Sequence, residues 1–188
     1  MHTTMIMIRH AESPFIIGEE RTRPLSLKGE RDVHSVTALI GQTINVIASS
    51  PYKRAIQTVE GIAKKNNLEV QLIENLKERT LKGEYRLSEE EIDNAIKKSF
   101  EDADFSLQEG ESIIDVQNRA IPAIKNLLKQ YEGKTIIIGT HGNIMTIIMN
   151  YFNEKYGYDF WKSTTKPDIY KLIFSQTKLV DVQRIWQE

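Results

Sequence analysis

Short apolar runs that end in polar residues constrain the fold of this chain more than any other feature of its sequence. Met5–Ile8 leads directly into an arginine and a histidine, Ile44–Ala48 leads into two serines, and residues 135–139 lead into a threonine and a histidine. Each run is too short for a typical helix and suits a strand that is buried on both faces. The polar residues then mark the ends of three strands.

Segments with helical periodicity separate these runs. Helices are expected over Val33–Ile40, from Ser50 onward, from Ser112 to about Tyr131, and from Ile144 onward. Further strands are expected at Glu69–Ile73, Tyr170–Phe174 and Leu179–Ile185. This alternation predicts an α/β fold, a three-layer α/β/α sandwich with a mostly parallel central sheet. Within it, Ser50 is expected to cap the second helix, with Pro51 at its first position.

The domain organisation follows from length and pattern. The chain has 188 residues, which suits one domain over residues 1–188. Residues 74–110 are more polar and less regular, and we expect them to form a short cap segment. Ser88 and Glu91 predict a capping box inside that segment.

Composition excludes several function classes. The formal net charge is −1, so binding to nucleic acid or to a membrane surface through bulk charge is not expected. There is no cysteine, which excludes disulfides, thiolate metal sites and thiol nucleophiles. No stretch is long and apolar enough to predict a membrane span. A cytoplasmic location is therefore expected, and the oligomeric state cannot be inferred.

Polar side chains are expected to meet at one edge of the sheet. Arg9 and His10 follow the first strand, Ser50 and Arg54 follow the second, and His141 follows the third. Parallel neighbouring strands would bring these residues together beyond their carboxyl ends, where such sheets bind ligands. Arginine matches the oxygens of a phosphoryl group, and neutral imidazole is a nucleophile near neutral pH. A phosphoryl site is therefore predicted.

Five motifs in one order also resemble a known family. They are "IRHAES", "SSPYKRAIQT", "LKERTLKGE", "GES" and "GTHGN". The chain is similar along nearly its whole length to the histidine phosphatase superfamily, which includes the cofactor-dependent phosphoglycerate mutases and many small phosphatases. The resemblance implies a phosphoglycerate mutase-like fold. It also implies a phosphoric monoester hydrolase that acts on a small phosphorylated molecule without a metal or cofactor.

The resemblance implies a role for each matching residue. His10 would be the nucleophile that carries the phosphohistidine, and Arg9 and Arg54 would bind phosphate. His141 would bind phosphate and stabilise charge in the transition state. Glu78 would be the proton donor, with Glu84 as the substitute.

Two further residues are expected at the substrate. Gly142 would keep the turn after His141 tight. Many family members place an asparagine at the position of Ile16, which has no donor to offer phosphate; Ser13 is expected to compensate in part.

Three other functions remain open on the sequence. A phosphoglycerate mutase is disfavoured because the segment after Glu78 lacks the mutases' motif and is short. A phosphate-binding protein without turnover is the alternative that Ile16 supports. A metal hydrolase built on His10, Glu12 and His141 lacks the usual helical spacing of such ligands.

The surroundings of the predicted site allow two kinds of substrate. The cations Arg21, Arg23, Lys77, Arg79 and Lys82 could be ordinary surface charges or a basic rim. A basic rim would favour a substrate with a second negative charge. The apolar residues 15–17 could instead contact a hydrophobic leaving group.

Overall fold

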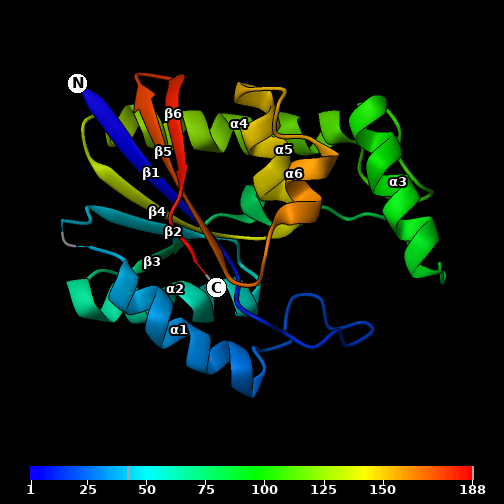
Figure 1. Cartoon of the computed structure of the whole chain (residues 1–188), viewed down its shortest axis with the longest axis horizontal. Coiled ribbons are helices and arrows are strands. Elements are labelled where there is room, and N and C mark those ends of the chain that lie inside the picture. The colour runs from blue at the N-terminus through cyan, green and yellow to red at the C-terminus, as the bar shows by residue number, and fades with distance from the viewer. Residues whose placement is uncertain (42, 188) are drawn as a thin grey trace.

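A six-stranded sheet forms the centre of the computed structural model, which describes residues 1–41 and 43–187. The strands are β1 (His2–Arg9), β2 (Val46–Ser49), β3 (Val70–Leu72), β4 (Thr135–Thr140), β5 (Asp168–Ser175) and β6 (Lys178–Arg184). The helices are α1 (Leu27–Leu39), α2 (Lys53–Asn66), α3 (Glu89–Glu101), α4 (Ile113–Gln130), α5 (Gly142–Phe152), α6 (Tyr158–Ser163) and the 3-10 helix η1 (Glu74–Leu76). Helices lie on both sides of the sheet (Figure 1), so the predicted α/β fold is confirmed.

The strand order explains why the polar strand ends meet. Across the sheet the order is β3-β2-β4-β1-β5-β6, so β4 lies between β1 and β2 and is parallel to both. Ile8 pairs with Gly139 from one side, and Ser49 pairs with the same glycine from the other side. The three strands therefore end at one edge of the sheet. β5 and β6 are antiparallel additions beyond β1.

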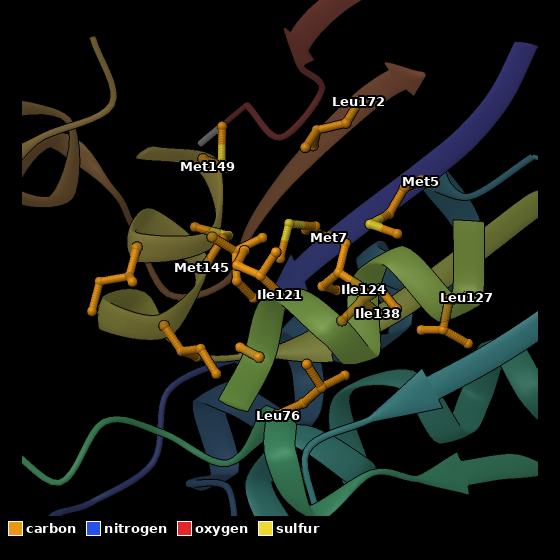
Figure 2. Close-up of a cluster of buried hydrophobic side chains, with 14 of the residues drawn as sticks. Met5, Met7, Leu76, Ile121, Ile124, Leu127, Ile138, Met145, Met149 and Leu172 are labelled. Carbon is orange, nitrogen blue, oxygen red and sulfur yellow. The ribbon is translucent and has the colours of Figure 1, made fainter. Parts of the chain in front are cut away.

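Alternating strand residues build two hydrophobic cores. Met5 and Met7 belong to a cluster that includes residues of α4 and α5, and Figure 2 shows Met7 beside Ile121 and Ile124. Ile8 belongs to a second cluster with residues of α1 and α2. Successive side chains of a strand point to opposite faces, so each face of the sheet is covered by its own pair of helices.

Helix starts mostly follow the sequence signals. Capping boxes form at Ser88 with Glu91 and at Ser112 with Asp115. The expected start of the second helix is wrong by two residues, because α2 begins at Lys53 with Tyr52 as its N-cap. The hydroxyl of Ser50 accepts the Tyr52 N–H and also bonds a histidine, so it lies before the helix and not at its cap.

The segment around 74–110 contains η1 and α3 with irregular chain between and after them. Arg119 of α4 donates to the carbonyl oxygens of Asn75 and Lys77 at 2.8 and 3.0 Å and binds the Glu111 carboxylate. α4 is thereby tied to the segment that precedes it. Within residues 1–41 and 43–187, no helix has the length and apolar character needed to cross a bilayer.

Candidate active site

His10 follows β1 directly, and its two neighbours define which ring nitrogen carries the proton. Nδ1 lies 2.7 Å from the carbonyl oxygen of Ala11, which can only accept, so Nδ1 carries the proton. Nε2 then has a free lone pair, and the Nε–H of Arg54 donates to it at 3.2 Å. His10 therefore presents a neutral imidazole whose basic nitrogen faces a guanidinium.

Arg54 lies on the first turn of α2 and is 1% exposed. Besides the bond to His10, it donates to the backbone carbonyl of Glu20 and, at 3.0 Å, to the carboxylate of the same residue. Its guanidinium also lies over the ring of Tyr52, 5.0 Å from the ring centroid. These contacts fix a buried cation beside the imidazole.

His141 follows β4 and is fully buried. Its ring centroid lies 5.2 Å from that of His10, edge to face. Its Nε2 is 2.7 Å from the hydroxyl of Ser50, which follows β2, and its Nδ1 is buried without a hydrogen-bond partner among the described residues. The two imidazoles thus share one pocket although they are far apart in sequence.

Arg9 is the last residue of β1, and a close approach to α5 positions its guanidinium. Nη1 donates to the backbone carbonyl of Thr164 at 3.1 Å and contacts the hydroxyl of the same threonine. A Cβ placed on Gly142 would lie 2.8 Å from the Arg9 Cζ. A side chain at this position would therefore displace the guanidinium from where it lies.

Glu78 reaches the start of α5 from the loop after η1. Its carboxylate accepts from the backbone N–H of Ile144 at 2.9 Å, of Asn143 at 3.2 Å and of Arg79 at 2.8 Å. Two of these donors belong to the first turn of α5, whose N-cap residue His141 makes no side-chain cap bond. Glu78 therefore caps this helix from a distant part of the chain.

Burial and charge keep both histidines neutral. Burial, and then the neighbouring Arg54, hold the pKa of His10 well below its usual 6.5. Burial, followed by electrostatic interaction with His10 and Arg54, lowers the pKa of His141 in the same way. Burial lowers the pKa of Arg9 while Glu78 raises it, so the acid and the cation lie within electrostatic reach of each other.

Other residues predicted at the site lie at its border or outside it. The hydroxyl of Ser13 donates to the Pro24 carbonyl at 2.6 Å and accepts from Arg23, so its one proton is already used. The Glu12 carboxylate accepts from Ser26 at the start of α1. Glu84 and Ile16 are exposed on loops.

Three charged residues at the site were not predicted to act in it. Glu20 binds Arg54, Arg23 is only 9% exposed, and Lys166 is close enough that Arg9, Arg23 and Arg54 all lower its pKa after burial does. The sequence predicts for Arg23 only an ordinary surface charge or a place in a basic rim. No periodicity marks loop residues of this kind, and only the charge-rich sequence around them offered a signal.

No metal site is apparent in the part of the chain that the structure describes. Within residues 1–41 and 43–187, no three His, Asp or Glu side chains are grouped closely enough to hold a metal ion. The arrangement brings together two neutral imidazoles, several guanidiniums and the carboxylates of Glu20 and Glu78, and the guanidiniums are suited to bind a phosphoryl group.

Comparison with solved structures gives several close matches in fold. A mycobacterial glucosyl-3-phosphoglycerate phosphatase superposes with a TM-score of 0.76 at 19% identity, covering 98% of this chain and 97% of that one. YhfR of Bacillus stearothermophilus gives 0.76 at 24% identity, covering 95% and 94%. A mutant phosphoserine phosphatase from Entamoeba histolytica, in complex with phosphoserine, gives 0.77 at 26% identity, with the same coverage.

Comparison of sequences identifies the family. No curated protein matches this chain. A family model, however, matches residues 5–177, nearly the whole length. The fold, the paired histidines and this match agree, and the chain belongs to branch 1 of the histidine phosphatase superfamily.

Proposed function

We propose that this chain hydrolyses a small phosphomonoester without a metal ion, through a phosphohistidine on His10. The observation that carries the proposal is the state of His10: Nδ1–H is bound to the Ala11 carbonyl, and the free Nε2 faces the guanidinium of Arg54. A buried neutral imidazole oriented in this way is a nucleophile that needs no base.

In the first step, His10 Nε2 forms a bond to phosphorus while the bond from phosphorus to the leaving oxygen breaks. Arg54 exchanges its bond to Nε2 for one to a phosphoryl oxygen, and Arg9 binds another. Charge that develops on these oxygens is met by donors already in place. We assign His141 Nδ1 to a third oxygen, because Ser50 can donate its hydroxyl proton to Nε2 and leave the proton of the ring on Nδ1.

Glu78 moves the proton in this mechanism. It protonates the leaving oxygen, and as a carboxylate it then takes a proton from the water that attacks phosphorus and breaks the bond to His10. We place the transferred proton on Oε2, whose single backbone bond, to Asn143, is the longer one. Glu84 is less suited because it is exposed on a loop.

The substrate is proposed to be a small phosphorylated metabolite. In support, two similar structures are named as phosphatases of glucosyl-3-phosphoglycerate and of phosphoserine, and the latter was solved with its phosphorylated amino acid. No observation favours phosphoglycerate mutase activity or loss of turnover. The cytoplasmic location stays a prediction.

The proposal is tested with an aryl phosphate in the presence of a chelator. We expect phosphate release from the wild type, its loss by at least ~10³-fold in His10→Ala, and no change in His34→Ala, whose histidine is exposed on α1. Brief exposure to labelled substrate should leave an acid-labile, alkali-stable label on the wild type alone. Activity that survives in His10→Ala would contradict the proposal.

A further inference from the structure

A carboxylate of the chain itself bridges two arginines at the site. Oε2 of Glu20 accepts from Arg54 Nη2 at 3.0 Å, and Oε1 lies 3.4 Å from Arg23 Nε. Arg54 in turn contacts the basic nitrogen of His10. One guanidinium thus connects the proposed nucleophile with an internal anion.

The two arginines around Glu20 form an arrangement that suits a phosphoryl group. Planar guanidiniums bind carboxylate and phosphate through the same pairs of oxygen atoms. Glu20 supplies two oxygens to two guanidiniums, as two oxygens of a phosphoryl group would. Its side chain is 47% exposed on the loop between β1 and α1, so it can leave without opening the core.

Arg23 is held by hydrogen bonds from one nitrogen of its guanidinium, and its Nε is a buried donor without a hydrogen-bond partner among the described residues. Its Nη1 donates to the Ser13 hydroxyl at 2.7 Å and to the carbonyl oxygens of Ser13 and Pro14 at 3.2 and 3.3 Å. Its Nε is buried and forms no hydrogen bond within the described residues, since its contact with Glu20 is an ion pair only. A buried donor without a partner is costly, and a ligand oxygen would satisfy it.

We propose that Arg23 is a third phosphate-binding arginine beside Arg9 and Arg54, and that Glu20 occupies its anion position until substrate displaces it. The inference rests on the proposed function for the identity of the ligand. It also explains how the site tolerates Ile16, which has no donor. Arg23 supplies that donor, and Ser13 orients Arg23.

The charge balance supports an exchange of anions. Burial and the neighbouring Arg23 lower the pKa of Arg54, whereas Glu20 raises it. Arg23, Arg9 and Arg54 all act on Lys166, so four cations converge where Glu20 and Glu78 contribute two negative charges. A phosphoryl dianion offers two charges and more acceptor atoms, and it can therefore replace the carboxylate.

This proposal predicts opposite effects for the two residues. Arg23→Gln should weaken the binding of inorganic phosphate by roughly tenfold or more, because a charge-assisted hydrogen bond is lost. Arg23→Lys keeps the charge but not the planar fork, and should recover only part of the affinity. Glu20→Gln should tighten phosphate binding by roughly threefold or more, because it removes an internal competitor.

Titration calorimetry with inorganic phosphate measures these dissociation constants, and the KM for an aryl phosphate should follow them. Glu19→Gln and Arg31→Gln are matched controls, because both side chains are exposed and lie outside the proposed contacts. Thermal unfolding of each variant checks the fold. Should Arg23→Gln fail to fold, Glu20→Gln and Arg23→Lys still decide the question.

Unchanged phosphate affinity in a folded Arg23→Gln variant, or weaker binding in Glu20→Gln, would overturn the inference. If Glu19→Gln tightened phosphate binding as much as Glu20→Gln, the effect would come from the net charge of the loop alone. This result would also overturn the inference. The wild type separates this inference from the proposed function: if it binds phosphate without turnover, the function fails while the phosphate titrations still test Arg23 and Glu20.

Discussion

At the scale of single residues, the site depends on neighbours with fixed hydrogen-bonding roles. A carbonyl can only accept and a guanidinium can only donate, so Ala11 and Arg54 together determine the tautomer of His10. The residue types could be predicted from their positions after the strands. The tautomer could not, because it depends on the direction of the Ala11 carbonyl and on Arg54, which lies on the first turn of α2.

Gly142 offers a test at this scale. Gly142→Ala should lower kcat/KM for an aryl phosphate by roughly tenfold or more, because the new Cβ would lie 2.8 Å from the Arg9 Cζ and displace the guanidinium. The Arg9 guanidinium is the end of a flexible side chain and can move, so the free energy of unfolding should change little. Steady-state kinetics and thermal unfolding measure both effects.

Gly157→Ala is the matched control, since the nearest atom to its added Cβ is the Glu154 carbonyl oxygen at 4.0 Å. It should leave kcat/KM unchanged. Full activity in Gly142→Ala would show that Arg9 needs no glycine beside it.

At the scale of elements, α5 depends on a partner outside its own sequence. Helix N-termini expose N–H groups that need acceptors, and His141 supplies no side-chain cap. Glu78 accepts from Asn143 and Ile144 instead. A capping box joins residues that are three positions apart, so the sequence could predict the caps at Ser88 and Ser112. It could not predict the cap that Glu78 supplies, because Glu78 is distant in sequence from α5.

Glu78→Gln should therefore have two effects at once. Loss of one acceptor oxygen at the α5 N-terminus should lower the free energy of unfolding by about 1 kcal/mol. Loss of the proton donor should also lower kcat. Urea unfolding and steady-state kinetics measure the two, and Glu84→Gln, on an exposed loop, should change neither.

An unchanged free energy of unfolding would contradict the capping role of Glu78. An unchanged kcat together with a reduced free energy of unfolding would support the capping role of Glu78 and contradict its role as proton donor.

At the scale of the whole molecule, burying two neutral histidines links stability to pH. His10 and His141 have pKa values held well below 6.5, first by burial, whereas both would titrate near 6.5 in the unfolded chain. Below pH 6.5 the unfolded chain therefore binds more protons than the folded one. The free energy of unfolding must then fall as the pH falls through this range.

We expect a loss of up to ~1.4 kcal/mol per pH unit per histidine below pH 6.5. Urea unfolding at pH 7.5, 6.5 and 5.5 measures this loss. These pH values lie above the range in which carboxylates such as Glu111, whose pKa is lowered, gain protons. His10→Gln should reduce the slope, and the exposed His34→Gln should not. A flat profile in the wild type would mean that the buried imidazoles gain protons in the folded state.

The sequence by itself determined the α/β class, most strands and helices, and the residues that follow β1, β2 and β4. Short buried strands and amphipathic helices can be predicted from local periodicity. Adjacent parallel strands have their carboxyl ends at the same edge of the sheet, whatever the conformation of the connecting loops. Local signals were less exact at the start of α2, because Ser50 is bonded to His141, which is distant in sequence.

Only the tertiary structure decided how the loops and side chains complete the site. It placed Glu20 between Arg23 and Arg54, Thr164 on Arg9 and Glu78 on α5. These contacts join segments far apart in the chain or depend on an irregular loop. Their partners are chosen by packing, burial and charge in three dimensions, which no local pattern in the sequence encodes.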